Sequence, residues 1–105
     1  MEQLKSEPLD EIDHVAVAVA DIERSVHWYT TSFKCEVERL EKTYAILRFA
    51  NMKLVLVLPS QQKWHVGYKK NDAASFGEIT ERTDGICSTF VADPTGNIVE
   101  LIPPK

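Results

Sequence analysis

The sequence predicts an α+β fold built from two related βαβββ-type modules, the second with a reduced or missing helix. Three observations lead to this prediction. Short runs of alternating apolar residues recur along the chain, one segment has apolar residues at helical spacing, and the chain contains an internal repeat. Because 105 residues leave room for one hydrophobic core, we expect a single domain, 1–105, with module one at about 12–59 and module two at about 64–103.

Module one is predicted to begin with a strand and a helix. The strand covers Ile12 to Val19, where His14 shares one face with small residues and the valines share the other face with Asp13. Asp21 then provides a carboxylate that can cap a helix from Ile22 to Phe33. Three β-prone runs, separated by polar breaks, follow at Glu36 to Leu40, Thr43 to Phe49 and Lys53 to Leu58.

Module two is predicted to open with a strand at Trp64 to Lys70. A helical turn around Ala73 to Phe76, capped by Asp72, stands where module one has its helix. Two further strands, at Ile86 to Ala92 and Asn97 to Ile102, flank the sequence Asp-Pro-Thr-Gly. These residue types are typical of a tight turn, since Asp can start it, Pro presets φ, and Gly can end it.

The internal repeat relates the two modules. An offset of 51 residues places DHVAVAVAD over WHVGYKKND and pairs His14 with His65. An offset of 44 residues places LVLVLP over IVELIP and pairs Leu56 with Glu100. Module two is therefore shorter by seven residues (51 − 44), and the shortening falls where module one has its helix. For this reason we expect the second helix to be reduced to a turn or lost.

Charge and composition exclude several classes of function. The chain has 12 basic and 16 acidic residues, a net charge of −4, and no basic cluster larger than Lys69 and Lys70, so nucleic acid is not expected as a partner. No apolar run approaches the length of a membrane span, and the opening residues do not resemble a signal peptide. Cys35 and Cys87 form no paired-cysteine motif, which favours a reduced, cytoplasmic protein.

Three polar residues lie on strand faces that are otherwise apolar or small: His14, His65 and Glu100. A buried carboxylate is costly unless it is paired, hydrogen-bonded or bound to a metal. Two histidines and one carboxylate on three strands would form an open three-ligand site for a divalent ion such as Fe, Mn, Ni or Zn. Alternatively, Glu100 lies on a solvated sheet edge and His14 is a hydrogen-bonded core histidine.

The two ends of the chain resemble one family. The segments IDHVAVAVADIERSVHWYTTSF and FVADPTGNIVELI are similar to the opening and closing motifs of the vicinal oxygen chelate superfamily, which includes glyoxalase I, extradiol dioxygenases, and fosfomycin- and bleomycin-resistance proteins. The resemblance implies paired modules that form an open barrel-like curved sheet. It also implies a divalent metal on the concave floor, with His14, His65 and Glu100 as its ligands.

The resemblance further implies a class of activity. Family members with four protein ligands carry Glu or Gln where this chain has Leu56, so three-ligand relatives are the closer match. They suggest a divalent-metal-dependent lyase, transferase or dioxygenase acting on a small oxygen-rich substrate, whose catalytic base the sequence does not identify. The alternatives are a metal-free protein that sequesters a small ligand, as bleomycin-resistance proteins do, and a structural or regulatory protein of the same fold.

Two further expectations concern the pocket and the assembly. Tyr44, Arg48 and Tyr68 are candidates for the wall of a substrate pocket, although residues of these types are more often ordinary strand-surface residues. A homodimer is expected because a small open half-barrel buries limited apolar surface. In relatives, the first-strand ligand of one subunit meets the other two ligands in its partner, and the resemblance implies the same arrangement here.

Overall fold

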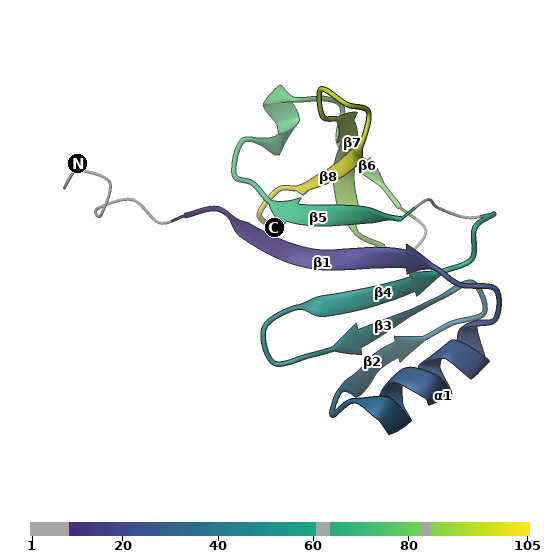
Figure 1. The fold of residues 1–105 in the computed structure, drawn as a ribbon. Coiled ribbons are helices and arrows are strands. Elements are labelled where there is room, and N and C mark those ends of the chain that lie inside the picture. Colours follow the sequence, from purple (N-terminus) through teal and green to yellow (C-terminus); the bar gives the residue numbers. More distant parts are fainter. Residues whose placement is uncertain (1–8, 61–63, 83–84) are drawn as a thin grey trace.

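A computed structural model describes residues 9–60, 64–82 and 85–105, which form an eight-stranded mixed sheet curled into a half-barrel (Figure 1). The strand order is β2-β3-β4-β1-β5-β8-β7-β6. The strands are β1 (Glu11–Ala18), β2 (Glu36–Leu40), β3 (Tyr44–Arg48), β4 (Lys53–Val57), β5 (His65–Lys69), β6 (Thr80–Glu81), β7 (Cys87–Ala92) and β8 (Ile98–Ile102).

The helix of module one, α1 (Ile22–Ser32), covers the convex face of β2, β3 and β4 (Figure 1). It begins as predicted, since the Arg24 N–H donates to Asp21 Oδ1 over 3.0 Å. Its buried residues Ile22 and Val26 pack against a cluster that includes Leu47 and Leu56. No helix in the described ranges has the length and apolar character needed to cross a membrane.

The concave face of module one carries a second apolar cluster. One residue of β1 and alternate residues of β3 and β4 form it, because neighbouring residues of a strand point to opposite faces. Its members are Ala16, Tyr44, Ile46, Val55 and Val57. The sheet of module one is therefore apolar on both faces, with one face turned to α1 and the other to the inside of the half-barrel.

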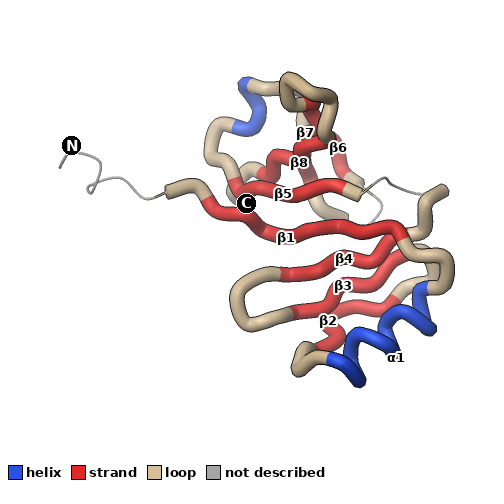
Figure 2. Tube along the Cα trace, in the orientation of Figure 1, coloured by secondary structure: helices blue, strands red, loops and turns tan. Residues whose placement is uncertain are grey.

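In module two the helix is reduced, as the shortened repeat predicts. The described part of this module contains a single 3-10 turn, η2 (Ala73–Ser75), in place of a long helix (Figure 2). The predicted cap is wrong, because the side chain of Asp72 makes no capping hydrogen bond and instead pairs with Lys70 Nζ at 3.3 Å. Strand β6 was not predicted, since its two residues are too few to show alternation.

The two modules meet through the antiparallel pair β1 and β5, and the register of this pair follows the repeat. Val15 lies opposite Val66, its own counterpart at an offset of 51 residues. On either side, His14 pairs with Gly67 and Ala16 pairs with His65. The offset of 51 residues turns each of these two pairs into the other. A pseudo-twofold axis therefore passes between the two valines, and it brings the two histidines to equivalent places beside it.

The strand register corrects the second part of the repeat. Ala16 pairs with Val55 in β4, and its counterpart Gly67 pairs with Glu100 in β8. The residue equivalent to Glu100 is therefore Val55, at an offset of 45 rather than 44. Leu56 points to the opposite face and is fully buried beneath α1. The fourth position of the concave floor is still apolar, although a different residue occupies it.

The turn between β7 and β8 is held by one carboxylate. Asp93 Oδ1 accepts from the backbone N–H groups of Thr95 and Asn97 at 3.0 and 2.8 Å. Gly96 has φ of 94°, in the left-handed region that favours glycine. Hydrogen bonds from the side chain and backbone of Asn97 hold the pKa of Asp93 below its ordinary value of 3.8.

We expect Asp93→Ala to lower the urea midpoint of unfolding at pH 7 and to lower it by a smaller amount at low pH. A carboxylate whose pKa is lowered by folding contributes its full stability above its unfolded pKa and loses it as pH falls through the folded pKa. Urea unfolding of wild type and variant between pH 2 and 7 measures this difference. Asp93→Asn is the control, because it keeps an acceptor oxygen that does not titrate. A difference in urea midpoint between wild type and Asp93→Ala that is constant with pH would contradict the assignment.

Candidate metal site

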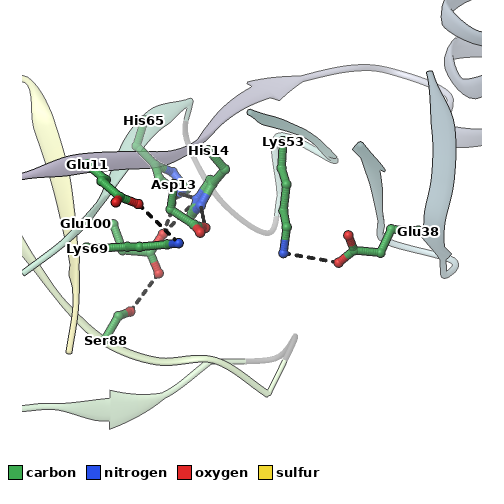
Figure 3. A network of polar contacts seen from close by, with 9 residues as sticks. All are labelled: Glu11, Asp13, His14, Glu38, Lys53, His65, Lys69, Ser88 and Glu100. Atoms are coloured by element: carbon green, nitrogen blue, oxygen red, sulfur yellow. Dashed lines mark hydrogen bonds and ion pairs between the residues drawn. The ribbon is translucent and has the colours of Figure 1, made fainter. Parts of the chain in front are cut away.

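Three donor atoms from three strands converge on the concave face of the sheet (Figure 3). His14 Nε2 lies 3.3 Å from His65 Nε2 and 3.1 Å from Glu100 Oε1. The His65 Nε2 to Glu100 Oε1 distance is 2.9 Å. All three residues are at most 4% exposed. We call these residues the triad; the sequence analysis selected the same three.

Adjacent strands position the triad through one glycine. Gly67 in β5 pairs with His14 in β1 on one side and with Glu100 in β8 on the other. A Cβ atom at Gly67 would lie only 2.2 Å from His14 Cε1. The missing side chain therefore leaves the space that the His14 ring occupies as it reaches across β5.

A β-bulge supplies a partner for the outer nitrogen of His14. Ile12 pairs with Tyr68 and His14 with Gly67, so Asp13 is an extra residue in β1. Its Oδ2 accepts a hydrogen bond from His14 Nδ1 at 2.9 Å (Figure 3). Strict alternation would put Asp13 on the opposite face, so the bulge corrects that expectation and leaves His14 Nε2 directed at the triad.

Hydrogen bonds within the site control its charge. Burial by itself lowers the pKa of His14, but hydrogen bonds to Asp13 and Glu100 outweigh it and raise the pKa to about 9. Burial by itself raises the pKa of Glu100, but bonds from both histidines and from Ser88 hold it well below its usual range. Without a metal, the site at neutral pH therefore pairs an imidazolium at His14 with a carboxylate at Glu100.

The second oxygen of Glu100 is held by groups that the sequence analysis missed. Ser88 Oγ donates to Glu100 Oε2 at 2.6 Å. Arg82 in turn donates from Nε to Ser88 Oγ at 3.0 Å and from Nη2 to the Ser88 carbonyl at 2.9 Å. Only the alternation of β7 could have placed Ser88 on this face, and no local pattern connects Arg82 to it.

The donor set fits a divalent metal ion. Ligand bonds of about 2.1 Å separate neighbouring donors by about 3.0 Å in an octahedral site and by about 3.4 Å in a tetrahedral one. The three separations in the triad, 2.9, 3.1 and 3.3 Å, lie close to these values. Two imidazoles and one carboxylate suit Fe, Mn, Ni or Zn. The hydrogen bond from His14 to Asp13 is the outer-sphere contact that metal-bound histidines ordinarily make.

Two of the three predicted pocket residues share the concave face with the triad. Tyr44 is buried in the concave cluster of module one, with the Arg39 guanidinium 5.6 Å from its ring centre. Arg48 shares that face but is exposed and paired with Glu36. Tyr68 alternates with His65 and Gly67 along β5, so its side chain stands on the other face. The assignment of Tyr68 to a pocket wall stays a prediction, on the face opposite the triad.

One chain supplies all three residues of the triad, because β1 and β5 pair within it. The expectation that His14 must meet the other two ligands in a partner subunit is therefore corrected. A homodimer stays a prediction from the small size of the half-barrel. Its formation is not needed to complete the donor set.

We expect Gly67→Ala to destabilise the protein by about 1–3 kcal/mol, because the added methyl must displace the His14 ring. In the His14→Ala background the same change should cost much less, or stabilise, since alanine suits a strand interior better than glycine. Urea unfolding of the four proteins measures this coupling. An equal cost in both backgrounds would show that the clash does not involve His14.

Comparisons with known proteins bear on the fold. No family model and no curated protein matches the sequence. Among solved structures, a hypothetical protein from Bacillus halodurans C-125 matches with a TM-score of 0.72 at 16% identity, over 93% of this chain and 96% of that chain. This likeness shows a shared fold.

Two further matches carry the names of the predicted family. A lactoylglutathione lyase from Agrobacterium tumefaciens has a TM-score of 0.46 at 16% identity, over 92% of this chain and 96% of that chain. A glyoxalase/bleomycin resistance protein/dioxygenase from Alicyclobacillus acidocaldarius has a TM-score of 0.43 at 20% identity, over 87% and 89% of the two chains.

Proposed function

We propose that the protein binds one divalent metal ion at the triad and is a glyoxalase-like metalloenzyme that acts on a small, oxygen-rich substrate. The observation that carries the proposal is the triangle of donor atoms, with sides of 2.9, 3.1 and 3.3 Å. Buried histidines with a purely structural role do not need to direct their ring nitrogens at one point. Here both Nε2 atoms and one carboxylate oxygen point at the same space.

The chain's own residues would hold and orient the ion. His14 and His65 would bind through Nε2, and binding would release the Nε2 proton of His14 to solvent. The Asp13 carboxylate keeps the His14 ring in place through Nδ1. Glu100 offers Oε1, because its Oε2 accepts from Ser88. A bound ion would supply Lewis acidity, which stabilises negative charge on substrate oxygens. Three protein ligands leave positions open for such oxygens.

The concave floor beside the triad carries ion-paired side chains that could contact the substrate. Lys53 pairs with His14 in the strand register and with Arg48 on its other side. Lys53 Nζ lies 3.2 Å from Glu38 Oε2 (Figure 3), and Arg48 pairs with Glu36. We include Arg48 and Tyr44 in the proposed pocket, with Lys53 as an addition. Opening of these ion pairs would free cationic groups for an anionic substrate.

We expect wild-type protein, purified without a histidine tag, to bind one divalent ion per chain. Glu100→Gln should bind it at least about 100-fold more weakly, since losing even an outer-sphere partner costs about 10–100-fold. Elemental analysis and titration with Mn(II), Fe(II), Ni(II) and Zn(II) test both statements. Glu41→Gln is the matched control, because Glu41 is an exposed carboxylate paired with Arg39.

The result also separates the two leading functions. Loss of binding in Glu100→Gln but not in Glu41→Gln would support the metalloenzyme. Wild-type protein that takes up none of the four ions would overturn it. That outcome would favour the metal-free protein that sequesters a small ligand, with the triad as a hydrogen-bonded group in its floor.

We expect the Co(II)-loaded protein to bind acetohydroxamate, whose two adjacent oxygens imitate an oxygen-rich substrate. Chelation at open positions should change the visible absorption of the ion, and the change should saturate at one ligand per ion. Acetate at the same concentration is the control, since its two oxygens share one carbon atom and can form only a strained four-membered chelate ring. A spectrum unaffected by acetohydroxamate would contradict a site with two accessible open positions.

A further inference from the structure

We propose that Arg82 is a positioning residue of the triad. It fixes Glu100 so that only Oε1 faces the site, and it holds the ring of His65 in place through Phe90. This inference concerns the role of the shortened part of module two, and it rests in part on the proposed metal site. The geometry comes from two separate sets of contacts, one to Glu100 and one to His65.

The first set runs through Ser88, whose side chain is fully buried. The Arg82 guanidinium donates twice to this residue, to Oγ at 3.0 Å and to the carbonyl at 2.9 Å. Because Oγ accepts from Arg82, its own proton is directed to Glu100 Oε2, at 2.6 Å. A nearby cation strengthens a hydrogen bond of this kind to a carboxylate. Glu100 therefore has one oxygen engaged on the side away from the histidines.

The second set runs through Phe90. The Arg82 guanidinium carbon lies 4.3 Å from the Phe90 ring centre, within the range of a cation–π contact. The Phe90 ring meets His65 edge-to-face, with 5.2 Å between ring centres and 82° between ring planes. Phe90 and Ser88 alternate on β7 and so present both contacts on one face. One guanidinium thus supports two residues of the triad.

The backbone of Arg82 is itself fixed at the base of a hairpin. Its N–H donates to the Ile86 carbonyl at 2.8 Å, and its carbonyl accepts from the Gly85 N–H at 2.9 Å. Gly85 has φ of 84°, which glycine adopts without strain. Strands β6 and β7 pair directly beside this loop. These backbone contacts therefore present Arg82 from a defined place beside β7.

The consequence for the proposed function concerns coordination. A carboxylate free to rotate can bind a metal through both oxygens, which would occupy a further position of the ion. With Oε2 held by Ser88, Glu100 binds through Oε1 alone. Arg82 thus maintains three protein donors and keeps the remaining positions for other ligands. It contacts neither the ion nor a substrate in this arrangement.

The first test uses the metal-free protein. In a double-mutant cycle of Arg82→Met and Glu100→Gln, the two effects on the unfolding equilibrium constant should be coupled by about threefold or more, as expected for residues of one network. Arg82→Gln replaces Arg82→Met in a second cycle, in case that variant does not fold. Arg24→Met with Glu100→Gln is the control cycle, because Arg24 is exposed on α1. Additive effects in the Arg82 cycle would overturn the proposal.

The second test uses Co(II)-loaded protein. Arg82→Met and Arg82→Lys should each weaken Co(II) binding by about 10–100-fold and change the intensity of the visible absorption, which reports the coordination number. A lysine ammonium lacks the planar pair of donors that Ser88 requires, so it should not rescue the site. An unchanged spectrum and affinity in both variants would overturn the role in coordination. Wild type that binds no Co(II) would instead overturn the proposed function, and the metal-free cycle would still decide the role of Arg82.

Discussion

The antiparallel pairing of β1 with β5 is the contact on which the site depends. Each module closes its own sheet through a parallel pair, β1 with β4 and β5 with β8. Among the described strands, only the central pair joins the two modules within one eight-stranded sheet. Because Val15 lies opposite its counterpart Val66, the pairing register also sets the distance between the histidines. A slip of one residue would turn His14 to the convex face.

The charges of the triad explain how the protein tolerates a carboxylate that is 3% exposed. Glu100 accepts bonds at both oxygens, and His14 carries the compensating positive charge because its pKa is raised to about 9. A buried pair of this kind is costly to break, since the remaining charge has no partner. The same contacts hold the three donors at separations suitable for a metal, so little reorganisation would accompany its binding.

The sequence predicted the strands, the helix and the triad because each has a local or repeated signal. Alternation located the long strands, Asp21 marked the start of α1, and the repeat singled out His14 and His65. What it missed depends on contacts between distant residues. The bulge at Asp13 breaks alternation without any turn residue to announce it. The one-residue change in register, from Leu56 to Val55, appears only when the strands are paired.

The site is asymmetric although the fold is nearly symmetric, and small side chains account for the difference. His14 extends over Gly67, whereas His65 pairs with Ala16, which carries a methyl group at the equivalent position. In β8 the floor offers Glu100, whereas β4 offers Val55.

A carboxylate at position 55 would make the donor set symmetric and fill a fourth position, and it would add a second buried negative charge to the site. The apolar residue in module one and the hairpin arginine in module two are therefore two parts of one arrangement, in which a single carboxylate is both buried and held in place.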